Sequence, residues 1–564
     1  MHSARAQSVW RWLLLGCILG VYLFNVERWQ PQVFFGVYQD DSFYFSTAKA
    51  LAQGHGYTLI SFPSSPPATK YPILYPWLLS WVWKLNPRFP DNVRLAIHVT
   101  EFFGCWTLIA TFFLLRRLKG LSEWVAICLT ALLAFQPFFV RLSGLVMSDV
   151  PFMAFMLTAL LLSRTGLCGR TRLPLILLAG LVAGLSVGIR IVGVAVAAGI
   201  FLSMVRSKAW RGACTFAAAG GAAMIAVLWP TVLHSTVTAK AASAGEPGWN
   251  QVLLNYTDYV RFQWSVSVPS LWAFLRLVKL NFMVLLTWPG AIVAGPSGAW
   301  GDRIMAALSV PIWLGIVRQS RHPEWRPFTY VLTFYTAILL VWSYTIPDRF
   351  LVPLIPLFLA GLWCEMQRLG GILAANLRPG ALLGHRILAA SFSLILGSLF
   401  AFIGWNYLLG DPKRLRDASA FQQRALVERQ QAYQWIREHT VPDDRIAAWE
   451  DVTLYLYTGR QALRPIAIRP QAAYAGDKLS LQRDLEHFCD APRHVGVRFW
   501  YSKDDDFRLE ADPERVTARM AEINAVLPLV FRSSGNYVQI HDASCVADAS
   551  RPECQAAAPI LFPH

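Results

Sequence analysis

Charged residues are scarce in this 564-residue chain: Asp, Glu, Lys and Arg make up 15% of it, against 55% hydrophobic residues. An ordinary soluble domain carries about 25% charge, so the composition indicates a membrane protein instead. Acidic residues are especially scarce before Asp411. That part of the chain contains 13 of the 35 acidic residues and 31 of the 51 basic residues. The basic residues are dispersed among apolar runs and form no stripe, which argues against nucleic acid as a partner and favours contacts with membrane lipids.

The chain also lacks the common motifs of metal and nucleotide enzymes. It has no Cys-x-x-Cys or His-Glu-x-x-His pattern, and His55, His98 and His234 are scattered, so the sequence supports no metal site. No cofactor is implied, although a divalent cation at an acidic pair stays open. The chain has no P-loop or dinucleotide-binding fingerprint, and no internal repeat of about 20–50 residues.

Long apolar runs separate the few charges and predict an all-α polytopic membrane protein with about eleven to twelve transmembrane helices. The first run is expected to stay in the protein, because no convincing small-residue cleavage site follows it. The expected helices lie near 12–26, 93–115, 121–140, 150–163, 173–189, 191–205, 212–233, 304–318, 327–346, 350–367 and 386–409.

Basic residues in alternate connections predict the orientation. By the positive-inside rule these loops and the N-terminus lie in the cytoplasm. The segments 27–92 and 234–303 and the C-terminal tail then lie on the external, periplasmic side of a bacterial inner membrane. The basic loops are 116–119, 164–172, 206–211, 318–326 and 368–386.

Two apolar segments do not fit a simple span. The segment 284–294 is interrupted by Pro289 and Gly290. Counting it as a twelfth span would move the basic loop 318–326 outside, so we expect a re-entrant or surface-lying segment. The aromatic segment 71–85 is too short to cross, and it is typical of a helix at the membrane interface.

The tail differs from the rest of the chain, so we expect two domains: a transmembrane domain over 1–410 and a small soluble α/β domain over 411–564. Cys545 and Cys554 are the favoured disulfide pair, by proximity alone, if the tail is external. The tail pattern predicts a helix over 418–440 and strands over 445–449, 495–501, 527–531 and 537–541.

Asp40 and Asp41 are the most unusual residues of the membrane part. They follow the first span and lie in an aromatic segment at the expected external surface. A carboxylate there could accept a proton from an attacking hydroxyl, and its neighbour could tune its pKa or bind a cation. The alternative is structural, since Asp41 and Ser42 could cap a helix over 43–53.

Four further charges fall on the same side, each with a structural alternative. Lys70 could contact a phosphate or extend to lipid headgroups, and Asp149 could cap the fourth span or face a cavity. Arg190 could form a hairpin turn or an inward anion contact. Arg349 suits phosphate oxygens, or it pairs with Asp348 at the interface.

These residues resemble motifs of the GT-C membrane glycosyltransferases, in the branch of the bacterial protein O-mannosyltransferases (glycosyltransferase family 39-like), aminoarabinose transferases and Rgt-type transferases. That family has an acidic pair followed by an aromatic residue and a helix, and this chain reads Asp40-Asp41-Ser-Phe-Tyr44-Phe-Ser-Thr-Ala-Lys-Ala-Leu-Ala-Gln-Gly. Lys70-Tyr71-Pro-Ile-Leu-Tyr is similar to the family's Lys-Pro-Pro-Leu-Tyr, with Tyr71 inserted. Arg349-Phe-Leu-Val-Pro-Leu-Ile-Pro is similar to its Arg-Tyr/Phe-Leu-x-Pro-x-x-Pro.

The resemblance implies transfer of a sugar from a polyprenyl-phosphate donor to a hydroxyl of a glycan, lipid or protein acceptor at the external face of the membrane. Asp40 would be the base, with Asp41 and Asp149 as further acidic residues of the catalytic site. The departing phosphate would be stabilised by three cations. They are Lys70, Arg190 and Arg349.

A different class of function stays open, a transporter or flippase that moves a sugar lipid without transferring the sugar. Such proteins favour charged residues at the bilayer midplane on broken helices, and often have inverted repeats. The candidate charges here cluster at one face instead. Glu101, inside the second expected span, is the exception.

Overall fold

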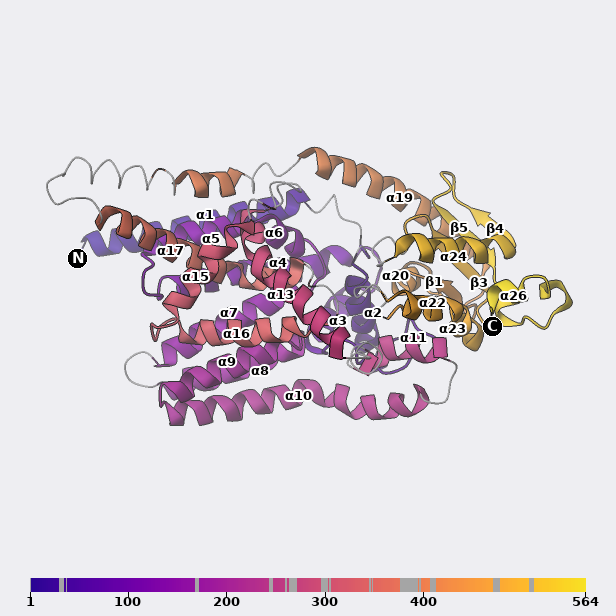
Figure 1. Cartoon of the computed structure of the whole chain (residues 1–564), viewed down its shortest axis with the longest axis horizontal. Coiled ribbons are helices and arrows are strands. Elements are labelled where there is room, and N and C mark those ends of the chain that lie inside the picture. Colours follow the sequence, from indigo (N-terminus) through magenta and orange to yellow (C-terminus); the bar gives the residue numbers. More distant parts are fainter. Residues whose placement is uncertain are drawn as a thin grey trace.

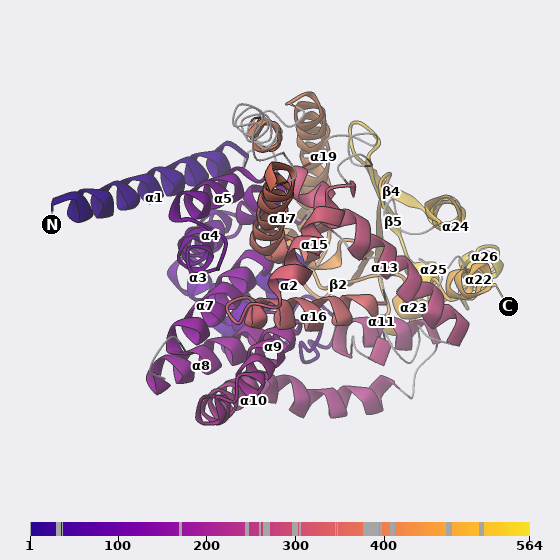
Figure 2. The same ribbon diagram turned by 60° about the vertical axis from the view of Figure 1, so that its left-hand side comes forward.

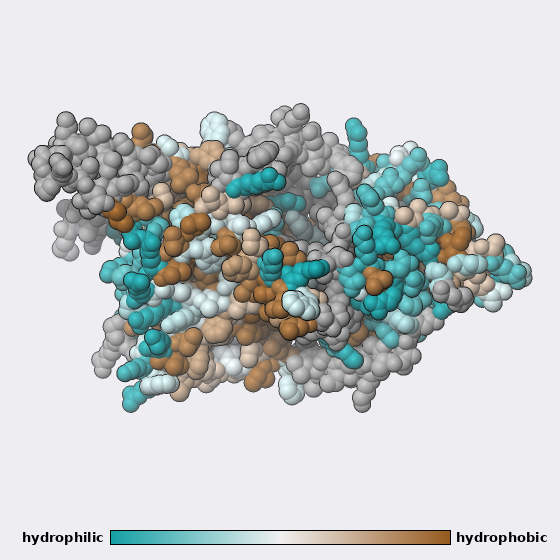
Figure 3. Space-filling view, viewed as in Figure 1, coloured by the Kyte–Doolittle hydropathy of each residue, from teal (hydrophilic) through white to brown (hydrophobic). Residues whose placement is uncertain are grey.

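The computed structural model describes residues 2–29, 35–36, 38–167, 172–242, 247–258, 261–262, 271–295, 303, 306–343, 346, 348–375, 394, 397–405, 412–469, 477–506 and 512–563. Figure 1 shows a bundle of helices on the left and a smaller α/β unit on the right. The surface of the bundle has large brown hydrophobic areas, whereas most of the α/β unit is teal (Figure 3). The fold class predicted from the sequence is therefore confirmed, whereas the expected boundary at 410/411 lies outside the described residues.

The first part of the chain forms the bundle and its connections. Its helices are α1 (His2–Trp29), α2 (Asp40–Ala52), α3 (Leu74–Leu85), α4 (Val93–Leu115), α5 (Glu123–Phe135), α6 (Pro137–Ser143), α7 (Asp149–Leu167), α8 (Leu173–Ile189), α9 (Gly193–Arg206), α10 (Trp210–Ala242), α11 (Pro247–Thr257), α13 (Leu271–Ala294), α15 (Ser309–Gln319), α16 (Arg326–Leu340), the 3-10 turns η2 (Asp348–Phe350) and η3 (Val352–Leu354), and α17 (Ile355–Ala375).

Fewer helices have the length of a membrane span than the sequence predicted. Within the described residues, six helices are long and apolar enough to cross, or seven if the bent pair α5–α6 is one span. Two other expected spans are the shorter apolar helices α8 and α9. The expected span over 386–409 lies mostly outside the described residues. The count of eleven to twelve therefore stays a prediction.

The expected helix over 121–140 is broken. Pro137 begins α6, and the two halves meet at an angle of 61°. Proline has no N–H to continue the helix, so the chain turns at the preceding residue. Gln136 fills the break: its side chain accepts the N–H of Phe139 at 2.7 Å and donates to the Ile292 carbonyl at 2.9 Å.

The segment 284–294 is not a separate re-entrant segment, whereas its position at the membrane surface stays a prediction. These residues end α13, a continuous 24-residue helix whose length and hydropathy fit a span. Pro289 should break it, because the carbonyl of Leu285 loses its helical partner. The indole of Trp313 donates to that carbonyl at 3.1 Å and replaces the lost bond.

Contacts between basic loops place them at one end of the bundle. Arg11 pairs with Glu123 at 3.1 Å, and Arg164 pairs with Glu324 at 3.7 Å. The Trp325 indole donates to the Lys119 carbonyl at 3.1 Å. The N-terminal helix and three of the predicted basic loops therefore share a side, as the charge pattern predicted.

Glycines bring α8 close to α10. A Cβ on Gly184 would lie 2.3 Å from the Gly220 carbonyl oxygen, so only glycine fits there. Such close approach of small residues is the common way in which helices pack in a membrane. It fixes the end of α8, where Arg190 lies.

The C-terminal unit is a five-stranded sheet with helices around it. The strand order is β2-β1-β3-β5-β4, with β1 parallel to β2 and β3, and β5 antiparallel to β3 and β4. The sequence predicted four of these strands approximately and missed β2. Cys545 and Cys554 form a disulfide, which confirms the favoured pair. The strands are β1 (Ile446–Ala448), β2 (Ala462–Leu463), β3 (Phe499–Lys503), β4 (Leu529–Arg532) and β5 (Val538–Asp542), and the helices are α19 (Pro412–His439), α20 (Asp451–Thr458), α22 (Lys478–Glu486), α23 (Asp490–Val495), α24 (Pro513–Val526), α25 (Ser544–Ala547) and α26 (Ala558–Leu561), with the 3-10 turn η4 (Pro552–Cys554).

The two units meet in a shared buried hydrophobic cluster. Phe43 and Phe62 of the first connection and Trp249 of α11 belong to the same buried cluster as Val452 and Trp500 of the C-terminal unit. Figure 1 shows α2 between the bundle and this unit, and Figure 2 shows the same two units from a second direction. The C-terminal unit is therefore packed directly onto the elements that carry the acidic pair.

Candidate functional site

The acidic pair lies in the first turn of α2. The helix begins at Asp40, and its N-cap Gln39 makes no side-chain capping bond. The interpretation of Asp41 and Ser42 as a cap before residue 43 was therefore wrong. The first turn of a helix favours negative charge, because the helix dipole is positive at this end and the first N–H groups have no partner within the helix.

Asp40 lies between two partners from distant segments. The Tyr71 hydroxyl donates to its Oδ1, and the Arg349 guanidinium donates to its Oδ2 at 2.5 Å. The Asp40 side chain is 17% exposed and that of Arg349 is 21% exposed. Arg349 belongs to η2 and is 309 residues from Asp40 in the sequence. Its ion pair is with Asp40, although Asp348 is its neighbour in the chain.

A second ion pair lies beside the first. Asp149, the first residue of α7, contacts Arg190 Nη1 at 2.5 Å, and the Asp149 side chain is fully buried. Arg190 is the extended residue between α8 and α9, so it lies at the hairpin break and also faces inward. Arg190 thus combines a position at the helix break with an ion pair to a buried carboxylate.

Aromatic and hydroxyl groups join the two pairs. The guanidiniums of Arg190 and Arg349 lie 4.9 Å and 5.5 Å from the same Phe350 ring. Ser148 is 2.9 Å from the Tyr44 hydroxyl and accepts from Arg190 at 3.4 Å. Tyr44 in turn packs on Tyr71, with 4.9 Å between ring centroids. The structure thus brings the two ion pairs, Tyr44 and Tyr71 together.

Lys70 faces the protein and not the lipid headgroups. Its Nζ donates to the Asn255 side chain at 3.1 Å and lies 5.7 Å from the Tyr256 ring. It lines a small pocket with Asp40 and Tyr71, whereas Asp149 and Arg349 are not among the lining residues. Of the charged residues predicted for the site, Asp40 and Lys70 line this pocket. The lining is Gln39, Asp40, Phe43, Lys70, Tyr71, Tyr256, Glu450, Asp451, Val452, Thr453 and Arg464.

Half of this pocket was missed from the sequence. Asp451 accepts a hydrogen bond from the Tyr256 hydroxyl and lies 3.9 Å from Arg464 Nε. These residues come from α11 and the C-terminal unit. The sequence around Asp40 contains no pattern that predicts contacts with these distant segments. One signal was available: Glu450 and Asp451 form a second acidic pair at a helix start, as Asp40 and Asp41 do.

Burial and neighbouring charges separate the acidities of the pocket groups. Burial raises the pKa of Asp40, but the Arg349 guanidinium and the Tyr71 hydroxyl outweigh it and hold the pKa below its ordinary value. Burial raises the pKa of Asp41 to about 7, although both its oxygens accept backbone N–H groups. Burial, together with Arg464, lowers the pKa of Lys70 to about 7. At neutral pH Asp40 is therefore ionised, whereas Asp41 is close to half protonated.

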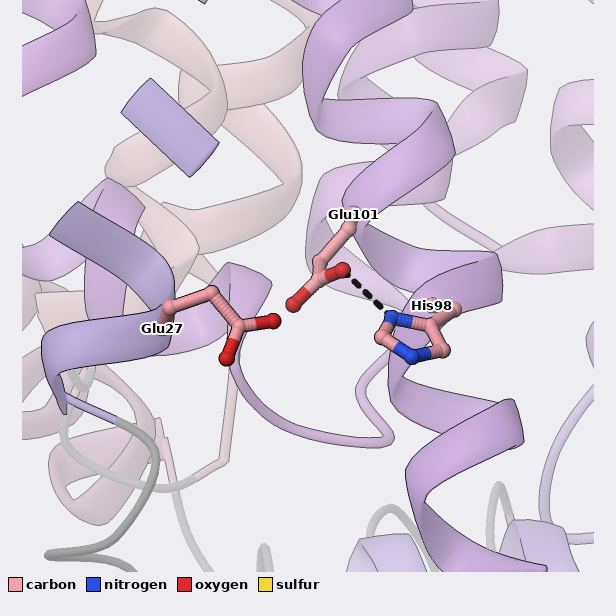
Figure 4. Close-up of side chains that lie close together, drawn as sticks. All are labelled: Glu27, His98 and Glu101. Carbon is pink, nitrogen blue, oxygen red and sulfur yellow. Dashed lines mark hydrogen bonds and ion pairs between the residues drawn. The ribbon is translucent and has the colours of Figure 1, made fainter. Parts of the chain in front are cut away.

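One group of side chains has the composition of a cation site. Glu27 of α1 and His98 and Glu101 of α4 point toward one another, and their ligand atoms lie within 4.8 Å (Figure 4). His98 Nδ1 is 2.7 Å from Glu101, and Arg94 pairs with Glu27. The group contains none of the residues around Asp40. Glu101 is thus accounted for by its local partner.

Comparisons with known proteins define the fold. No family model and no curated protein matches the chain. The solved structure of ArnT from Cupriavidus metallidurans, bound to undecaprenyl phosphate, matches with a TM-score of 0.53 at 15% identity, covering 95% of this chain and 98% of that one. The oligosaccharyltransferase of Archaeoglobus fulgidus, tethered with an acceptor peptide, matches with a TM-score of 0.54 at 11% identity, covering 94% and 74%.

Both matches extend over nearly the whole chain, including the C-terminal unit. The chain has the GT-C fold of membrane glycosyltransferases, as the motif resemblance implied.

Proposed function

We propose that this protein is a membrane glycosyltransferase that moves a sugar from a polyprenyl phosphate to a hydroxyl group of a glycan, lipid or protein. The observation that carries the proposal is the ionised Asp40 carboxylate, held between Tyr71 and Arg349 at a pocket that also contains Lys70. A base with a depressed pKa stays available at neutral pH, and adjacent cations suit a phosphate leaving group.

In this mechanism Asp40 takes the proton of the acceptor hydroxyl as the oxygen attacks the anomeric carbon of the sugar. The bond between that carbon and the phosphate oxygen breaks, and the electron pair leaves with the polyprenyl phosphate. Arg349 and Lys70 stabilise the resulting negative charge. Arg190, held by Asp149, contributes a second guanidinium beside the Phe350 ring that Arg349 also contacts.

A second cavity next to Arg349 supports a lipid-linked donor. It is an open cavity with a volume of about 550 Å³, lined mainly by apolar side chains, with Asp348 and Arg303 as its charged members. An apolar cavity with a few charged lining residues suits a molecule that has an isoprenoid chain and a charged head. The apolar lining includes Phe138, Trp288, Ala291 and Ile292.

Two observations favour an external active site. The Cys545–Cys554 disulfide is typical of an oxidising compartment. The basic loops gather at one end of the bundle, whereas the acidic pair faces the C-terminal unit. We therefore assign the C-terminal domain, 411–564, and the pocket to the periplasmic side.

The test compares cells that lack this protein with cells complemented by the wild-type chain or by Asp40→Asn at equal protein level. Mass spectrometry of the extracted glycolipids, polysaccharides and proteins should show one sugar addition that is lost without the protein. We expect Asp40→Asn to reduce this product at least about 100-fold, as for removal of a general base. Undiminished product would eliminate Asp40 as the base. A sugar lipid that is moved across the membrane without any glycosidic product would favour the flippase.

A further inference from the structure

The C-terminal domain contacts the segment that begins α2 at several points. We call this segment, made of Gly36, Gln39, Asp40, Asp41 and Ser42, the entry turn. Two of its residues have left-handed backbone: φ is +98° at Gly36 and +58° at Gln39. A non-glycine residue in this region is strained and persists only where its surroundings hold it.

Arg464 holds the strained residue. Its guanidinium donates to the side-chain oxygen of Gln39, the residue directly before Asp40. The Arg464 side chain is 19% exposed, and its guanidinium lies 4.8 Å from the Trp449 ring. The arginine is thus fixed on the C-terminal domain by the Trp449 ring and the nearby Asp451 carboxylate, while its Nη2 reaches the entry turn.

Thr453 holds the other side of the same turn. Its hydroxyl lies 2.7 Å from the Ser42 hydroxyl, and the pair is buried. Its side chain also packs on Gly36 so closely that a Cβ there would lie 2.7 Å from the threonine methyl. The Gly36 N–H in turn donates to the Asp41 carboxylate at 2.7 Å.

We propose that Arg464 and Thr453 are positioning residues: from the C-terminal domain they hold the entry turn, and so keep the Asp40 carboxylate against Tyr71 and Arg349. The inference rests on the proposed function only in its expected effect on sugar transfer. The mechanical part, a turn held by another domain, can be measured without any substrate.

The first measurement is hydrogen–deuterium exchange of the full-length protein in lipid nanodiscs, at the peptides that cover 38–45. We expect Thr453→Val and Arg464→Gln to speed exchange there, because each removes one of the two holds. Thr453→Ser keeps the hydroxyl and should restore slow exchange. Thr458→Val is the matched control: Thr458 is buried in the same helix, but its hydroxyl bonds only to the local carbonyl of Leu454 and N–H of Arg460.

The second measurement is the sugar product in complemented cells at equal protein level. A displaced catalytic group costs about 10- to 100-fold in rate, so we expect Thr453→Val and Arg464→Gln to lose at least about tenfold. Thr453→Ser should recover the product, and Thr458→Val should leave it unchanged. Arg469→Gln controls for loss of a buried arginine of the same domain, which pairs with Asp484 at 2.7 Å.

The outcomes separate the two proposals. Unchanged exchange at 38–45 in both variants would contradict the claim that Arg464 and Thr453 stabilise the entry turn, whatever the product level. Faster exchange with full product overturns the positioning role. If Asp40→Asn keeps full product, the proposed base is wrong, while the exchange result still decides whether the C-terminal domain holds the turn.

Discussion

Two adjacent carboxylates in the entry turn have opposite electrostatic environments. Asp40 meets a guanidinium and a phenol, and its pKa falls below the ordinary value. Asp41 is 1% exposed and accepts two backbone N–H groups, and burial together with the nearby carboxylates raises its pKa to about 7. Neighbouring residues of one helix turn point in different directions, so a sequence of two like acids gives two unlike groups.

Ionisation of Asp41 should make stability depend on pH. Its folded pKa of about 7 lies above the unfolded value of about 4, so the folded state holds an extra proton between these limits. Stability therefore falls as pH rises from about 4 to 7, by up to about 4 kcal/mol, and levels off above the folded pKa. Thermal unfolding of the detergent-solubilised protein at several pH values measures this slope. Asp41→Asn cannot ionise and should have a flatter slope, and an equal slope in both proteins would contradict the assignment.

The candidate residues could be named from the sequence, but their partners could not. The motif resemblance and the charge pattern predicted that Asp40, Lys70 and Arg349 share a side. Pairing Asp40 with Arg349 and Lys70 with Asn255 depends on contacts across 309 and 185 residues. Local patterns carry no information on such pairs.

Helices were predicted well where apolar length alone decides their bounds. The segment 93–115 matches α4 at both ends, and 173–189 matches α8. The predictions went wrong at prolines, where the result depends on tertiary partners. Pro137 divides a helix into α5 and α6, whereas Pro289 leaves α13 continuous because Trp313 supplies the missing donor.

Packing of α8 on α10 predicts contrasting effects of two glycine substitutions. Gly184→Ala places a methyl group against the Gly220 carbonyl, and we expect a loss of about 1–3 kcal/mol of stability. Gly221→Ala meets nothing within 4 Å and should be neutral or slightly stabilising, because alanine favours the helix. Thermal unfolding of the two variants measures the difference. Equal melting temperatures would mean that the two helices do not approach closely.

At the scale of the whole molecule, the sequence divides into a membrane part and a tail, but buried contacts cross this division. The tail composition correctly predicted an α/β unit with a disulfide. It did not show that Phe62, Trp249 and His494 form one continuous stack from the first connection through α11 to α23. Residues from three separated segments complete one core, which no local pattern reveals.

A substitution in the first connection should therefore destabilise the C-terminal domain. Phe62 is 1% exposed, and Phe62→Ala should cost about 3–5 kcal/mol. Limited proteolysis of the full chain should then cut the C-terminal domain faster. Trp81→Ala is the control, because Trp81 of α3 is 51% exposed and outside this core. Equal cleavage of the two variants would contradict a shared core.

The hold on the entry turn also has a consequence for biosynthesis. Gln39 and Arg464 are separated by 425 residues, and Ser42 and Thr453 by 411. At about 5–20 residues per second, the ribosome needs roughly 20–85 seconds to make the chain between them. During that interval the nascent bundle already carries its acidic pair but lacks the contacts from the C-terminal domain that fix it. A chain that ends before the C-terminal domain would contain both Asp40 and Arg349 but would lack the contacts of Arg464 and Thr453 with the entry turn.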